Sequence, residues 1–258
     1  MKSTMKLTIA TLSGILFISS VHFTAMAAPS LAPSEMMMKT AAAKKNESKA
    51  EKLEKEETAK IDKLLAKNPE DLYAVYVSNE LTKTKGMEVF FKGNVQPKYD
   101  SYKGYLKKAS TLKDGVLQQP ADLPEGYEFV TAAMKGPNSG EYSAEMKAEA
   151  KKLGKQVYSK KINWVHARGI ELEYANGERK LILGFMRLDP NEVVNQKGYV
   201  YQSAEELSKK SKMYEKDPKN MLIWFEKGKQ FKIETDPGNP LTKEDLIKLA
   251  KTMGLTPF

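Results

Sequence analysis

The chain has 258 residues, of which 41% are hydrophobic, so it can form one large domain or two small ones, and it contains no cysteine. The lack of cysteine excludes disulfides, zinc–thiolate and iron–sulfur sites, thiol catalysis and a lipoprotein anchor on a lipidated cysteine. The formal net charge is +9, but only three of the 42 basic residues are arginines, Arg168, Arg179 and Arg187. Because arginine recognises phosphates and base edges in a bidentate manner, this composition argues against a nucleic-acid partner. We attribute the diffuse lysine to solubility, with loose attraction to anionic wall polymers or lipid headgroups as the alternative.

Residues 1–27 have the pattern of a secretory signal peptide. Two lysines precede a mostly apolar stretch at 7–23, and an Ala-Met-Ala sequence supplies the small residues of a cleavage site. We predict cleavage between Ala27 and Ala28, which leaves a secreted, extracellular chain that can associate with the cell wall. The alternative is an uncleaved membrane anchor, because the apolar stretch nearly reaches the ~20 residues that a bilayer requires.

Residues 28–68 are predicted to be a linker that is partly disordered and partly a charged helix. Residues 28–43 are rich in Pro, Ser, Ala and Met, whereas 44–67 are dominated by Lys, Glu and Ala. Glu51 and Lys55 have the spacing of an ion pair on an exposed helix. A stalk or a partner-binding coiled helix is the functional alternative, but no heptad repeats often enough for a coiled coil. We therefore interpret this helix as solvated.

Residues 69–117 are predicted to be a helical segment or subdomain, although they can instead complete the domain that follows. The apolar element at 72–81 is expected to be helical. Tyr99, Tyr102 and Tyr105 recur every third residue in a lysine-rich stretch. Aromatic side chains between lysines are found in platforms for polyanions or sugars, but this spacing more often marks the core-facing side of a helix, which we expect here.

Residues 118–258 are predicted to form an α+β domain with an antiparallel sheet, either a meander or a half-open barrel, and packed helices. At its end, 221–225 and 230–234 have the pattern of a hairpin. Thr242 and Asp245 have capping-box spacing for a last helix that ends at Gly254. The other predicted elements are strands at 127–134, 156–168 and 198–201, helices at 143–153 and 203–215, and a hairpin of 169–174 and 180–188 turned at Asn176-Gly177.

Two stretches resemble a domain of unknown function. Leu123-Pro124-Glu125-Gly126-Tyr127 before a strand resembles its "LPEGY" opening, and 222–250 is similar to its closing hairpin and helix. That domain occurs in extracytoplasmic parts of anti-sigma-factor-like membrane proteins and in secreted proteins of spore-forming Gram-positive bacteria. The resemblance covers about 118–258. No sigma-binding domain precedes the hydrophobic segment, which argues against direct sigma regulation.

The resemblance implies a lipoprotein-carrier or sigma-regulator sensor fold, a half-open sheet around an apolar groove, with no catalytic residues and no cofactor. We accordingly expect a secreted, non-enzymatic binding or sensing module of the cell envelope. Its partner would be an envelope component, an apolar ligand or a membrane protein. The alternatives are a carboxylate-dependent hydrolase of wall polymers and a structural envelope protein held by its lysine-rich surface. If the sheet is half-open, the groove would be lined by Trp164, Leu172, Leu183, Phe185 and Trp224.

The residue types of known catalytic and metal sites are sparse. His166 is the only histidine after the leader, and no nucleophile-elbow sequence accompanies it. Glu171 and Glu173 share a strand face and could converge for hydrolysis, but alternating glutamates are typical of the solvated face of a sheet. Residues 189–192 and 236–239 contain calcium-ligand types without the spacing of a calcium loop and are interpreted as turns.

Overall fold

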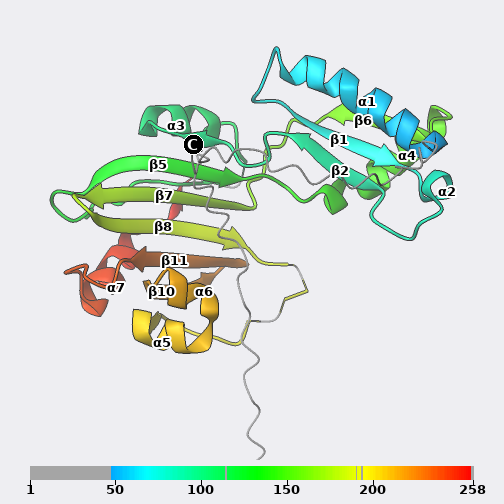
Figure 1. Ribbon diagram of the computed structural model, residues 1–258. Helices are drawn as coiled ribbons and strands as arrows, with labels where there is room; N and C mark the ends of the chain where they lie inside the picture. Colours follow the sequence, from blue (N-terminus) through cyan, green and yellow to red (C-terminus); the bar gives the residue numbers. More distant parts are fainter. Residues whose placement is uncertain (1–47, 114, 190, 193, 257–258) are drawn as a thin grey trace, which may run out of the picture. The chain divides into compact units, whose positions relative to one another are not determined.

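The structure, a computed structural model, describes residues 48–113, 115–189, 191–192 and 194–256 (Figure 1). The predicted signal peptide, its cleavage site at Ala27 and Ala28 and the stretch 28–43 lie outside these residues. The described residues belong to one compact unit. They form antiparallel sheets with packed helices, so the prediction of an α+β fold is confirmed.

Helices and strands are interspersed along the described chain. The helices are α1 (Lys49–Leu65), α2 (Asn79–Thr82), α3 (Tyr102–Ala109), the 3₁₀ helix η1 (Ser139–Tyr142), α4 (Ser143–Lys152), α5 (Ala204–Lys210), α6 (Lys212–Lys216) and α7 (Lys243–Thr252). The strands are β1 (Leu72–Val77), β2 (Val89–Gly93), β3 (Lys98–Tyr99), β4 (Val116–Leu117), β5 (Glu128–Lys135), β6 (Val157–Lys161), β7 (Gly169–Asn176), β8 (Arg179–Arg187), β9 (Val200–Gln202), β10 (Asn220–Glu226), β11 (Lys229–Thr235) and β12 (Leu255–Thr256).

The smaller main sheet has the order β2-β1-β6, with both neighbours antiparallel to the central β1. All six side chains of β1 are buried. Tyr73, Val75 and Val77 form one apolar cluster with Ile61 of α1, while the alternate side chains join the main core. The prediction of a helix at 72–81 is therefore wrong. Valine and tyrosine favour strands, and a strand buried on both faces loses the polar–apolar alternation that would reveal it.

The interpretation of 69–117 as a helical segment is also wrong. This stretch supplies β1 to β4, and β1 pairs with β6 from the region assigned to the next domain. The alternative that the stretch completes the following domain fits these pairings. The short β4 pairs with β12 at the C-terminal end of the described chain.

Helix α1 forms where the charged helix was predicted, but it is not only a solvated linker. Ser48 and Glu51 form a capping box at its start. Its Ile61 is 1% exposed within the cluster on β1. The Ser159 hydroxyl of β6 donates to a Glu57 carboxylate oxygen at 2.6 Å, so polar contacts also fasten α1 to the small sheet.

The larger sheet is antiparallel throughout, with the order β3-β5-β7-β8-β11-β10-β9. Both predicted hairpins are confirmed, and they place Leu172 opposite Leu183 and Trp224 opposite Phe231. Because β11 lies beside β8 and β9 follows β10, the strands do not form a simple meander (Figure 1). The order of the described strands ends at β3 on one side and β9 on the other, so this sheet is open.

Helices α3 and α7 pack against the core of the larger sheet. The Tyr105 side chain of α3 is fully buried, and its hydroxyl donates to the carbonyl of Leu117 at 2.5 Å. The predicted capping box of Thr242 and Asp245 begins α7, and the buried side chains of α7 include Leu246. The tyrosine spacing in α3 thus marks a core-facing side, as expected.

Two elements are shorter in the structure than predicted from the sequence. The helix expected at 203–215 is split at Ser211, whose extended backbone ends α5 and whose hydroxyl accepts a hydrogen bond from the Met213 N–H to cap α6. The strand expected at 156–168 is limited to β6, and residues 162–168 leave the small sheet to reach β7 in the larger one. This segment, which we call the connection, carries Trp164.

Candidate functional site

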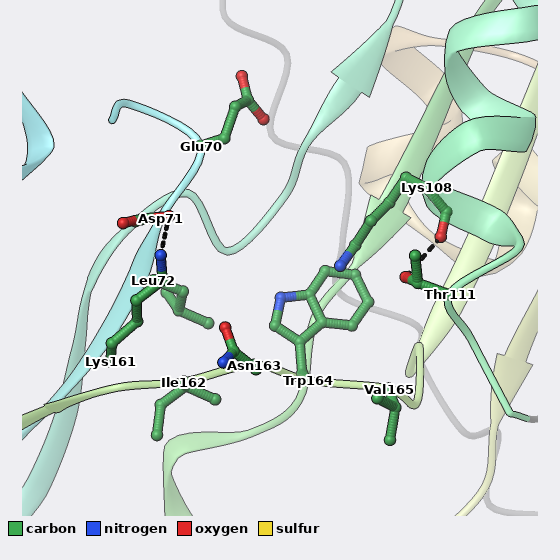
Figure 2. Close-up of a pocket in the computed structure, with 10 residues that line it drawn as sticks. All are labelled: Glu70, Asp71, Leu72, Lys108, Thr111, Lys161, Ile162, Asn163, Trp164 and Val165. Atoms are coloured by element: carbon green, nitrogen blue, oxygen red, sulfur yellow. Dashed lines mark hydrogen bonds and ion pairs between the residues drawn. The ribbon is translucent and has the colours of Figure 1, made fainter. Parts of the chain in front are cut away.

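A pocket of about 310 Å³ lies beside the connection. Its walls come from three places in the sequence, namely 70–72 at the start of β1, 161–165, and Lys108 and Thr111 at the end of α3 (Figure 2). The Ile162 N–H donates to the Leu72 carbonyl at 2.8 Å. These contacts bring together residues that are distant in the sequence.

Trp164 and Lys108 are the central pair of the pocket. The Lys108 Nζ lies 4.3 Å from the centroid of the Trp164 ring, a cation–π contact. Trp164 is 7% exposed. Gly136 packs beside this ring, since a Cβ there would lie at van der Waals distance, 3.7 Å, from Trp164 Cε2, and its tight contact would be with the Val95 carbonyl oxygen at 3.0 Å. The indole therefore has a fixed place between the β5 end and α3.

The end of α3 is held in place by two further hydrogen bonds. The Thr111 hydroxyl donates to the Lys108 carbonyl at 2.7 Å (Figure 2). The Lys113 N–H donates to the Val165 carbonyl at 2.8 Å, which ties the loop after α3 to the connection. The Lys113–Val165 hydrogen bond thus joins the two backbone segments that carry Lys108 and Trp164.

Burial lowers the pKa of Lys108, because removal of water disfavours the charged amine. In the part of the chain that the structure describes, no carboxylate lies within ion-pair distance of its Nζ. The indole N–H of Trp164 likewise has no hydrogen-bond acceptor among the described residues, and its nitrogen is on the ring edge turned to the Leu72 side of the pocket (Figure 2). The pocket therefore presents two donors that the described residues do not satisfy.

The other charged groups of the pocket have polar partners. Lys161 Nζ lies 2.7 Å from an Asp71 carboxylate oxygen, and this hydrogen bond raises the pKa of Lys161 (Figure 2). Glu70 accepts a hydrogen bond from the Asn94 side-chain amide at 3.3 Å. Lys108 thus differs from Lys161 in having an aromatic ring, rather than an acid, as its neighbour.

The predicted groove residues are core residues rather than an open surface. Leu172 and Leu183 are fully buried and face one another across β7 and β8. Phe185 and Trp224 are also buried, and both rings pack on Phe231, at centroid distances of 6.0 and 5.2 Å. These four side chains are members of the main core cluster, and their role in a groove stays a prediction. Trp164, the fifth, lines the pocket instead.

Glu171 is held by lysines on the face of the larger sheet opposite to Leu172. Its carboxylate lies 2.8 Å from Lys232 Nζ and 3.7 Å from Lys135 Nζ. Glu234 shares Lys232 at 2.9 Å. Burial pushes the pKa of Glu171 up, but the two lysines outweigh burial and leave the pKa below its usual value. Glu171 is therefore an ionised structural partner and does not hold a proton near neutral pH.

The remaining candidates have structural positions. Glu173 pairs with Lys180 at 3.0 Å, so the two glutamates of β7 have separate lysine partners. His166 is exposed on the connection. Asp236 accepts from Lys219 Nζ at 2.7 Å and closes a turn by accepting the Asn239 N–H at 3.0 Å, as interpreted from the sequence. Among the described residues, no three His, Asp or Glu side chains gather as a metal site, and none of the described helices has the length and hydropathy of a membrane span.

The two stretches that carry the family resemblance meet in the structure. The Asn239 side-chain amide, just before α7, donates to the Tyr127 hydroxyl at 2.7 Å. This contact gives residues of both stretches a structural role. The family assignment stays a prediction. Comparisons of the chain with protein-family models, with curated proteins and with solved structures gave no match.

Proposed function

We propose that this protein is an exported, non-catalytic binding module of the cell envelope that holds a small anionic ligand in the pocket beside Trp164. The observation that carries the proposal is the partly buried Lys108 ammonium, which lies over an indole and has no carboxylate partner among the described residues. A bound anion would supply the negative charge that the described residues do not place beside Lys108. Export is supported by the leader pattern of residues 1–27.

The pocket defines the chemistry of such a ligand. Its volume of about 310 Å³ is at the lower end of the range for small-molecule sites. A carboxylate or phosphate oxygen would accept from Lys108 Nζ and from the indole N–H, and charge-assisted hydrogen bonds of this kind are among the strongest in proteins. The apolar remainder of the ligand would contact Leu72, Ile162 and Val165, which also line the pocket.

The carboxylates of the larger sheet favour binding over the alternative of acid-catalysed hydrolysis. A general acid needs a raised pKa to carry a proton at neutral pH. The pKa of Glu171 is lowered, and Glu173 is paired with Lys180. Both side chains therefore act as partners of lysines.

The test is isothermal titration calorimetry of the protein with inorganic phosphate and with benzoate, which share an anionic group and differ in apolar surface. Lys108→Met keeps the aliphatic stem and removes the charge. We expect this variant to bind about 10- to 100-fold more weakly, since a hydrogen bond to a charged group contributes about 1.5–3 kcal/mol. Lys107→Met on the exposed side of the same helix is the matched control and should bind as wild type. Equal affinity of the Lys108 variant, or no binding of either probe, would refute the proposal.

A further inference from the structure

Two exposed loops project from one end of the small sheet. The first, 83–87, precedes β2, and the second, 151–156, consists of the last two residues of α4 and the turn that precedes β6. Every residue in both loops is exposed. Met87 is 83% exposed and Leu153 is 52% exposed, the highest values among the large hydrophobic side chains of the described residues. Each loop therefore holds an apolar side chain in water.

The two loops flank the end of β1. The Val77 N–H donates to the Glu88 carbonyl at 2.8 Å, and the Ser78 N–H donates to the Gln156 carbonyl at 2.9 Å. Since residues 88 and 156 are on opposite sides of the central strand, the loops leave the sheet about 10 Å apart, which is two strand spacings. Figure 1 shows α2 and α4, which are next to these loops in the chain, at the arrowhead end of β1. Both apolar side chains thus lie on segments at the same end of the small sheet.

This surface, which we call the loop end, is strongly basic. The sequences Lys-Thr-Lys-Gly-Met and Lys-Lys-Leu-Gly-Lys-Gln contain no acidic residue. The neighbouring Glu88 pairs with Lys147 at 2.7 Å, and Glu80, Glu57 and Glu149 also lie close by, with Glu57 interacting electrostatically with Lys155 and Glu149 with Lys152. The lysines of the two loops are Lys83, Lys85, Lys151, Lys152 and Lys155.

We propose that the loop end docks on an anionic lipid bilayer, with Met87 and Leu153 among the headgroups and the surrounding lysines against lipid phosphates. Isolated apolar tips ringed by lysines suit a headgroup layer, where apolar burial and attraction to anionic lipid add together. The two apolar side chains are single tips rather than the large contiguous patch that often marks a protein interface. This surface is distinct from the pocket at Trp164, and its role does not depend on the proposed ligand.

The direction of α1 relative to the small sheet can be derived from two contacts. Leu65, at the end of α1, lies against Gly93, which pairs with Leu72 at the start of β1. Glu57, in the middle of α1, bonds Ser159 in the middle of β6. Helix α1 therefore begins, at Lys49, toward the loop end.

The test is cosedimentation of residues 46–258 with phosphatidylcholine vesicles, with and without phosphatidylglycerol. This fragment is one compact unit that contains both apolar clusters, and it lacks the apolar stretch at 7–23, which would bind lipid by itself. The test variant is Met87→Glu/Leu153→Glu. The matched control is Leu64→Glu/Val130→Glu, which replaces the two other exposed large hydrophobic side chains with the same charge. Circular dichroism checks that both variants fold.

We expect salt-sensitive binding to phosphatidylglycerol vesicles, at least about 10-fold weaker binding of the test variant, and wild-type binding of the control. Equal loss in both variants, no loss in the test variant, or no binding of the wild-type fragment would overturn the proposal. Salt-sensitive binding to soluble polyphosphate by wild type and test variant alike, without vesicle binding, would overturn it in favour of a wall polymer. Phosphate or benzoate titration of the test variant should be unchanged, which separates this result from the fate of the pocket.

Discussion

Replacement of Trp224 by alanine should strongly destabilise the larger sheet. Trp224 is 6% exposed, stacks on Phe231 with centroids 5.2 Å apart, and contacts the Tyr199 ring at 5.5 Å. Truncation of a buried tryptophan costs about 3–5 kcal/mol, a large part of the ~5–15 kcal/mol that stabilises a typical domain. For a fold of this size, each kcal/mol lowers the melting temperature by about 2–4 °C. The expected decrease is therefore about 6–20 °C.

Thermal unfolding followed by circular dichroism measures this decrease, with urea unfolding as a second measurement of the free energy. Trp224→Phe is the matched variant, because it keeps an aromatic ring against Phe231, leaves a smaller cavity and should cost less than the alanine variant. If Trp224→Ala melts within 2 °C or so of wild type, the side chain is not a core residue and the packing argument fails.

The charge cluster and the leader give further predictions. Lys232→Met leaves the carboxylates of Glu171 and Glu234 without their shared cation and should cost about 1–3 kcal/mol in urea unfolding at pH 7, whereas Lys180→Met, whose lysine is half exposed, should cost under about 0.5 kcal/mol. The pKa of Glu171 is lowered from 4.5, so the ionised carboxylate stabilises the fold fully above pH 4.5, and this contribution is lost as the pH falls through the folded-state pKa. The cost of Lys232→Met should therefore shrink in acid. A cost that stays constant to acid pH would contradict this. N-terminal sequencing of exported protein should find Ala28 first, and recovery of only full-length, membrane-bound chain would contradict cleavage.

The local sequence pattern was sufficient to predict an element where one of its faces is buried and the other is exposed to solvent. The alternation of Ile170, Glu171 and Leu172 predicts a strand, and Asn176-Gly177 predicts its turn, because both signals lie within a few residues. Strand β1 gives no such alternation, since α1 covers one of its faces and the main core the other. Its strand character depends on neighbours that are distant in the sequence.

The pocket could not be predicted for the same reason. Lys108 and Trp164 are far apart in the sequence, and only the packing of α3 against the connection brings them together. One local signal was available, since Lys108 follows Tyr105 by three residues and thus lies near the core-facing side of its helix. A lysine in that position is unusual, and its environment, rather than its residue type, makes it a candidate for ligand binding.

The glycine at position 184 has a consequence for strand alignment. Gly184 is opposite Glu171 on one neighbouring strand and opposite Lys232 on the other, and a Cβ there would come within 3.2 Å of both side chains. The ion pair between Glu171 and Lys232 therefore passes over β8 and joins two strands that are not neighbours. A one-residue slip of β11 would turn Lys232 to the opposite face of the sheet. The missing side chain thus allows an electrostatic crosslink that keeps three strands in register.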